Sequence, residues 1–234
     1  PFRVIARKAL GFDSREELKN YFMTLSDCLK DSSSPIMIYF SGAIFQRGLH
    51  TVGLKYNPTG EGDCPWEYMD VNDFRKYPIE KNYYRAMNSD DLANSLYESF
   101  AEKKRIVFLE TVFSNKADVV LQENIDTLNF PSSRQYKLSG SAEAKLLLFA
   151  SIAGELEQVK DLLQYEDIDV NYPTQQGLTP LGMACANGQL LVVRELLKHK
   201  KIQVDFLCDG KTPLELAQQK GHHEVVDELL KHPI

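Results

Sequence analysis

A 33-residue repeat constrains the second half of the chain more than any other feature of the sequence. The triplet Thr-Pro-Leu begins at residue 179 and again at residue 212. An earlier copy, "AKLLLFASIAGELEQVKDLLQY" from Ala144, lacks Thr-Pro but keeps a glycine that precedes a Leu-Leu pair by eight and nine residues. Repeats of this length are single supersecondary units that stack on their neighbours to bury a core. We therefore expect an array of stacked units over residues 144–234.

The residues within each copy predict a turn followed by two antiparallel helices. Threonine is a good N-cap, and proline at the first helical position loses no hydrogen bond. Gly188 and Gly221 stand where a first helix must end in a left-handed residue. The Val-Val and Leu-Leu positions recur at helical spacing, so one face of each second helix can pack on the neighbouring repeat.

In period and pattern this region resembles ankyrin repeats. The family usually carries histidine after Thr-Pro-Leu, whereas this chain has Gly182 and Glu215, so we expect a weaker turn on an unchanged fold. The resemblance implies an all-α domain of about three repeats. It also implies a domain without chemistry of its own that binds other proteins through its turn tips and the concave face of its first helices.

The turns "DVNYPTQQGL" and "QVDFLCDGK" contain the candidate partner-binding residues, which are Tyr172, Gln175, Phe206 and Leu207. Exposed apolar residues at the tips would favour a partner site, and packing against the next turn would be a structural role. Both interpretations stay open on the sequence alone. His222 and His223 are expected to be a solvated helix start.

The first half alternates helical and strand patterns. Ser14 with Glu17 forms a capping-box pattern before an apolar helical period that continues to Leu29. Apolar strands follow at 36–42 and 105–113, a hairpin at 48–72, and a helix at 89–104. This order predicts an α+β domain with an antiparallel sheet over residues 1–130. Residues 131–143, poor in apolar periodicity, are the expected linker to the repeats.

The hairpin carries three polar residues that could act together. If residue 56 pairs with residue 66, His50 lies opposite Asn72 and diagonal to Asp70. A slip of two residues would place Asp70 directly opposite His50, and a slip of one residue would separate the three side chains. An acid or amide that holds one imidazole nitrogen leaves the other free to take a proton from a thiol or hydroxyl. The alternative is a lone polar histidine that water or backbone satisfies.

The run of helix, apolar strand, "GLHTVGLKY" and "WEYMDVN" resembles the second half of papain-like cysteine proteases, and is most similar to the YopT-type effectors. The resemblance covers about residues 13–113 and implies an α+β papain-like fold. It implies His50 as catalytic base, Asp70 as its orienting acid and Asn72 in a supporting role. Val71 and Thr51 depart from the proline and alanine of the family pattern.

The nucleophile of that family is a cysteine early in the chain, at the start of a helix. Cys28 is near the end of a helix and Cys64 follows the histidine, so neither fits. The chain begins at Pro1 rather than methionine, and we expect the nucleophile upstream of it. Alternatively, the domain has lost its nucleophile and only binds partners.

Composition limits the other classes of function. The net charge is −6, so nucleic acid is not an expected partner. The chain lacks an apolar run of about 18 residues that would span a membrane. Four scattered cysteines without metal-ligand spacing predict no metal, no cofactor and a reducing compartment.

Two hypotheses follow. In the first, the chain is an effector that a bacterium secretes into the host cell cytoplasm. There its cysteine protease-like domain catalyses hydrolysis or acyl transfer at an amide of a host protein, and the ankyrin repeats bind that protein. In the second, it is a non-enzymatic ankyrin adaptor. In both we expect a monomer.

Overall fold

The computed structural model describes residues 3–12, 14–31, 36–44, 48–57, 64–70, 85–100, 106–114, 141–174 and 177–232. The chain divides into two compact units, Pro1–Phe130 and Pro131–Ile234. Each unit is described by itself.

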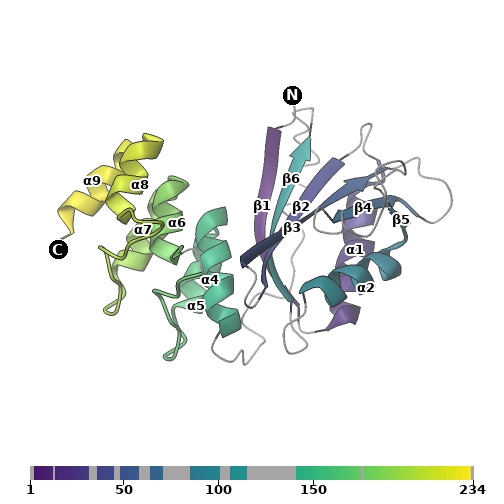
Figure 1. The fold of residues 1–234 in the computed structure, drawn as a ribbon, viewed down its shortest axis with the longest axis horizontal. Coiled ribbons are helices and arrows are strands. Elements are labelled where there is room, and N and C mark those ends of the chain that lie inside the picture. Colours follow the sequence, from purple (N-terminus) through teal and green to yellow (C-terminus); the bar gives the residue numbers. More distant parts are fainter. Residues whose placement is uncertain are drawn as a thin grey trace. The chain divides into compact units, whose positions relative to one another are not determined.

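The described residues of the first unit form an antiparallel sheet and two helices (Figure 1). The strands are β1 (Arg3–Phe12), β2 (Ile36–Ile44), β3 (Gly48–Tyr56), β4 (Trp66–Asp70), β5 (Arg85–Met87) and β6 (Ile106–Ser114). They lie in the order β1-β6-β2-β3-β4-β5, so the last strand in sequence is inserted between the first two. The helices are α1 (Arg15–Leu29) and α2 (Ser89–Phe100), which pack on each other. The predicted combination of helices with an antiparallel sheet is confirmed.

The core lies between the two helices and one face of the sheet. Alternate residues of each strand are buried there, because successive side chains of a strand point to opposite faces. β2 contributes Ile36, Ile38 and Phe40, and α1 contributes a stripe at helical spacing, namely Leu18, Tyr21, Phe22, Leu25 and Leu29. The Ser14 side chain accepts a hydrogen bond from Glu17 N–H at 3.2 Å, so the predicted cap of this helix is present.

Aromatic rings fill the centre of this core. The Phe22 ring lies 5.6 Å from Phe40 and 5.5 Å from Trp66, and Trp66 lies 4.9 Å from Tyr56, all with tilted or edge-on geometry. Such pairs contribute about 0.5–1.5 kcal/mol beyond the area they bury. The two strands of the hairpin and α1 are therefore fixed to one another through a single aromatic cluster.

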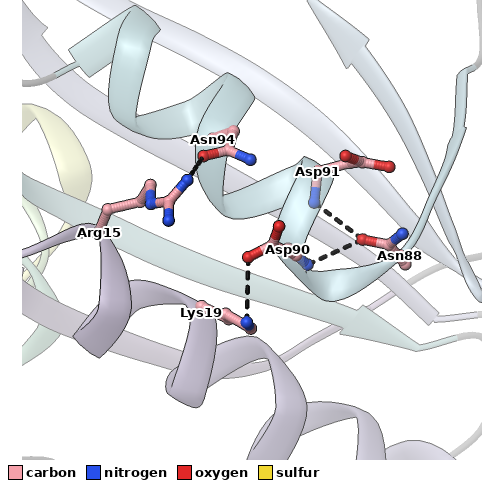
Figure 2. A network of polar contacts seen from close by, with 6 residues as sticks. All are labelled: Arg15, Lys19, Asn88, Asp90, Asp91 and Asn94. Carbon is pink, nitrogen blue, oxygen red and sulfur yellow. Dashed lines mark hydrogen bonds and ion pairs between the residues drawn. The ribbon is translucent and has the colours of Figure 1, made fainter.

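Polar contacts close the outer edge of the two helices (Figure 2). Arg15 of α1 donates to the Asn94 amide oxygen of α2, and Lys19 lies 3.1 Å from the Asp90 carboxylate. Asn88 caps α2, since its side-chain oxygen accepts from the N–H groups of Asp90 and Asp91. Exposed ion pairs contribute at most about 1 kcal/mol, so these contacts set the helix alignment more than the stability.

The second unit contains two rows of helices (Figure 1). The first row is α4 (Ser141–Ala153), α6 (Pro180–Ala186) and α8 (Pro213–Lys220), and the second row is α5 (Leu156–Leu162), α7 (Leu190–Leu197) and α9 (His223–Lys231). Neighbours pack within each row. Thr179 and Thr212 cap α6 and α8, and Gly188 and Gly221 follow these helices with φ of 70° and 75°. The predicted turn–helix–helix unit is confirmed.

Candidate functional site

The β3–β4 hairpin has the register on which the first candidate site depends. Tyr56 pairs with Trp66, and Val52 pairs with Asp70. The backbone of His50, which pairs with Gly42 on β2, is thus two residues from the position opposite Asp70. The side chains of His50 and Asp70, and the whole of Asn72, lie outside the described residues. Their catalytic assignment stays a prediction.

The rest of this hairpin face is packed core. Val52, Leu54 and Tyr56 on β3, with Trp66 and Tyr68 on β4, are all buried under the helices. These residues stand at every second position counted from His50 and from Asp70, and such positions share one face of a strand. A substrate therefore cannot approach the described part of this face without displacing the core.

The two thiols of this unit lie in different surroundings. Cys28 lies in the last turn of α1, and burial, followed by the negative charge of Asp27, raises the pKa of its thiol despite nearby Lys8. A helix C-terminus also disfavours a thiolate. Cys64 is half-buried just before β4. That neither thiol is the nucleophile stays a prediction.

A buried acid in the same core belongs to the fold. Glu110 of β6 is almost completely buried and accepts a hydrogen bond from the Tyr21 hydroxyl of α1. Among the described residues, groups of three or more histidine, cysteine or acidic side chains that could hold a metal are absent. The helices described are all too short or too polar to cross a membrane.

The turn before α8 forms a rigid finger. The N–H of Cys208 donates to Lys211 O at 2.7 Å, and the N–H of Lys211 donates to Cys208 O at 3.0 Å. Asp209 and Gly210 between them have φ of 51° and 74°, as a type I′ hairpin turn requires. Both central residues are held in the left-handed region, so the tip has little conformational freedom.

The predicted partner-binding residues differ in exposure around this finger. Leu207 is 55% exposed, whereas Phe206 and Tyr172 are half-buried. Asn171 joins the neighbouring turns, because its side chain donates to Lys201 O and accepts from Gln203 N–H. Gln175 lies outside the described residues. Of the four candidates, Leu207 is the one that presents a large apolar surface.

Each repeat also caps the first helix of the repeat before it. Gln189 donates to Ile152 O at 3.3 Å, and His222 Nε2–H donates to Ala186 O at 3.2 Å. Both donors directly follow a helix-ending glycine, and both acceptors are carbonyls that a helix end leaves unsatisfied. The prediction that His222 is solvated is wrong: it is half-buried and stacks on Gly188, while His223 is exposed.

A second contact between repeats replaces the missing family histidine. The Cys208 thiol lies 3.2 Å from the Thr179 hydroxyl and accepts from Thr179 N–H at 3.4 Å. A Cβ at Gly182 would lie 2.2 Å from that sulfur, so the glycine makes room for the cysteine. Burial raises the pKa of the neighbouring Cys185 thiol to about 12. Sequence analysis missed this contact, although a glycine in place of the usual histidine was its signal.

The stacked helix pairs and their 33-residue spacing agree with the comparison against protein families. The ankyrin-repeat family matches residues 147–234, with three copies. Residues 147–234 are ankyrin repeats. The family match leaves residues 1–146 outside it, so the papain-like fold is not confirmed for the first unit. Ankyrin repeats bind proteins, so a protein partner is the class of ligand expected for this unit.

Other comparisons add little. A solved structure of a predatory endopeptidase from Bdellovibrio bacteriovorus in complex with an immunity protein contains a chain that is 36% identical over the aligned part. The alignment covers 37% of this chain and 45% of that chain, less than half of its length, with a TM-score of 0.35. A search of curated proteins finds no match.

Proposed function

We propose that the chain is a protein-binding adaptor, whose ankyrin repeats hold a partner protein through the finger at Leu207. The observation that carries this proposal is a leucine with 55% of its surface exposed beside a type I′ turn. Burying a leucine side chain contributes about 1.5–3 kcal/mol. A tip that is already rigid loses little conformational entropy on binding, which lowers one of the costs of association.

The surroundings of Leu207 support a partner with an apolar pocket. Asp205 and Asp209 flank it in the sequence and are exposed, so a basic rim on the partner would complement them. Phe206 and Tyr172 are half-buried. In this proposal the first unit is a second folded domain and not an enzyme, since the face of its sheet that contacts the two helices is packed core.

The test compares two exposed leucines. Leu191 of α7 is 59% exposed and is a matched control away from the finger. A photo-crosslinking residue at 207 should capture a protein that the same residue at 191 does not capture. With that protein purified, Leu207→Asp should weaken binding at least tenfold by calorimetry, and Leu191→Asp should leave the affinity unchanged. Equal effects of both substitutions would contradict the proposal.

A second candidate function rests on the hairpin register. Pairing of Val52 with Asp70 supports a histidine–acid pair at His50 and Asp70 of the papain-like kind. In that proposal the thiolate of a cysteine upstream of Pro1 attacks an amide carbonyl of a host protein. His50 takes the thiol proton and gives it to the leaving amine, and water or another acceptor then releases the acyl group from the cysteine. The repeats would select the target of a bacterial effector acting in the host cytoplasm, with Asn72 in support.

A thiol-directed activity probe distinguishes the two functions. Full-length protein that is a cysteine protease should be labelled at a single cysteine, and His50→Ala should abolish the labelling. Labelling that persists in His50→Ala, or that occurs at Cys28 and Cys64 alone, supports the adaptor.

A further inference from the structure

Two turns of the second, helical unit have the same hydrogen-bonding pattern. After α5, the N–H of Ile168 donates to Tyr165 O at 3.2 Å, three residues earlier. After α7, the N–H of Ile202 donates to His199 O at 3.0 Å, again three residues earlier. Hydrogen bonds of this kind close β-turns that have two residues at the tip. The helices α5 and α7 are therefore followed by equivalent turns.

The tips of these turns carry opposite charges. Glu166 and Asp167 stand at the tip after α5, which we call the acidic turn. Lys200 and Lys201 stand at the tip after α7, which we call the basic turn. All four residues are exposed, and within the described part of the chain none of their side chains forms a hydrogen bond or an ion pair. Their charges are therefore available to a partner.

One side chain fixes the two turns relative to each other. The Asn171 amide donates to Lys201 O at 2.6 Å and accepts from the N–H of Gln203 at 2.9 Å. The backbone N–H of Asn171 also donates to the Asp169 carboxylate at 3.1 Å, just after the acidic turn. Since α5 and α7 pack on each other, their axes lie about 8–10 Å apart. The two tips form a bipolar patch in which acid and base lie side by side.

A patch of this kind is complementary to itself. A two-fold rotation about an axis midway between the tips exchanges their positions, so the acidic turn of each copy faces the basic turn of the other. A partner with charges of one sign, such as nucleic acid, would attract one turn and be repelled by the other. The net charge of −6 opposes the approach of two copies, so their attraction requires a local arrangement such as this one.

We propose that the bipolar patch, formed by Glu166, Asp167, Lys200 and Lys201, pairs two copies of this chain in a two-fold symmetric dimer. The contact joins exposed charges, so its strength falls as salt screens them. The patch does not include the finger at Leu207, and the proposal does not depend on the adaptor function. It differs from the monomer expected from the sequence, because the position of one turn beside the other depends on the fold.

The test reverses the charges of one turn at a time. The acid variant carries Lys200→Glu and Lys201→Glu, and the base variant carries Glu166→Lys and Asp167→Lys. In either variant alone the patch has a single sign, so two copies repel each other. In a mixture, the acid variant meets the base variant and both contacts regain opposite charges. A swapped variant with all four substitutions is again complementary to itself.

Sedimentation velocity over a range of protein concentrations measures the dissociation constant of the dimer. The salt concentrations are about 0.01 M and 1 M, where the Debye length is about 30 Å and 3 Å. We expect dimers of wild type and of the swapped variant at low salt, weakened at least tenfold at high salt. The acid and base variants alone should each dimerise at least tenfold more weakly than wild type. Their equimolar mixture should restore the dimer, which also shows that both variants are folded.

A control separates the patch from net charge. The base variant has less net negative charge than wild type, so it would associate more strongly if net charge alone decided. Lys30→Glu with Lys220→Glu, at two exposed positions outside the patch, changes the net charge as the acid variant does and should weaken the dimer less than tenfold. Wild type that stays monomeric at low salt would overturn the proposal. So would a mixture that associates no more strongly than the separate variants.

Discussion

At the scale of single residues, the contact of Cys208 with Thr179 and Gly182 shows how a departure from a family pattern is compensated. The usual histidine is replaced by a glycine, and a thiol from the next repeat occupies the space beside it. The sulfur is a weak acceptor, yet it satisfies the buried Thr179 N–H that would otherwise be costly.

Gly182→Ala tests this compensation. Alanine favours a helix by about 1 kcal/mol over glycine. The added methyl nevertheless overlaps the Cys208 sulfur, and overpacking of this kind costs about 1–3 kcal/mol, so we expect a net loss of stability in urea denaturation. In the Cys208→Ala background the sulfur is absent, and the contacts that remain, 3.2 Å to the Thr179 hydroxyl and 3.3 Å to the Cβ of residue 208, are tight without overlap, so the same substitution should cost clearly less. A loss of equal size in both backgrounds would show that the two residues are not coupled.

At the scale of elements, the capping box of α8 predicts both where this helix begins and that its Glu215 carboxyl is ionised. Glu215 accepts from Thr212 N–H at 2.8 Å while Thr212 accepts from Glu215 N–H at 3.2 Å, which completes a capping box. The two hydrogen bonds that the Glu215 carboxylate accepts from Thr212, first from its backbone N–H and then from its hydroxyl at 3.0 Å, lower the pKa of this carboxyl. The ionised acid is therefore the form that caps the helix.

This lowered pKa predicts acid sensitivity with a defined sign. A group whose pKa is depressed in the folded state contributes stability above its unfolded value, about 4.3 for glutamate, and loses it as the pH falls through the folded value. Glu215→Gln removes that contribution at neutral pH but cannot be protonated. We expect the urea midpoint of wild type to fall further than that of Glu215→Gln between pH 6 and pH 3. Parallel decreases would contradict the capping role of the carboxylate.

At the scale of the whole molecule, the cysteines divide evenly between the two units. Cys28 and Cys64 are half-buried in the first, and Cys185 and Cys208 are completely buried in the repeats. A buried thiol reacts only when its surroundings open, and local opening in packed regions requires several kcal/mol. The two pairs of thiols can therefore report on the two units independently.

We expect iodoacetamide to modify Cys185 and Cys208 far more slowly than Cys64 in the native protein, about a hundredfold for an opening free energy near 3 kcal/mol. Peptide mapping along a urea titration should show both buried thiols becoming reactive together at the midpoint of the helical unit. Modification of Cys208 at the native rate of Cys64 would contradict the burial of the interface between repeats.

The sequence by itself determined what depends on neighbours in the chain. The 33-residue period, the Thr-Pro caps and the left-handed glycines predicted the repeats. Apolar patterns predicted α1, β2, β3, β4 and β6, and acids at its start with lysines after its end predicted α2, because all of these patterns are local. Strand alternation left more than one β3–β4 register open, and the observed pairing of Tyr56 with Trp66 selects one of them. Tertiary structure alone decided the rest. β5 is only three residues long, β1 pairs with β6 a hundred residues away, and His222 caps a helix 36 residues earlier. These features have no local signal, since their free energy comes from pairing and packing between segments that only the folded chain brings together.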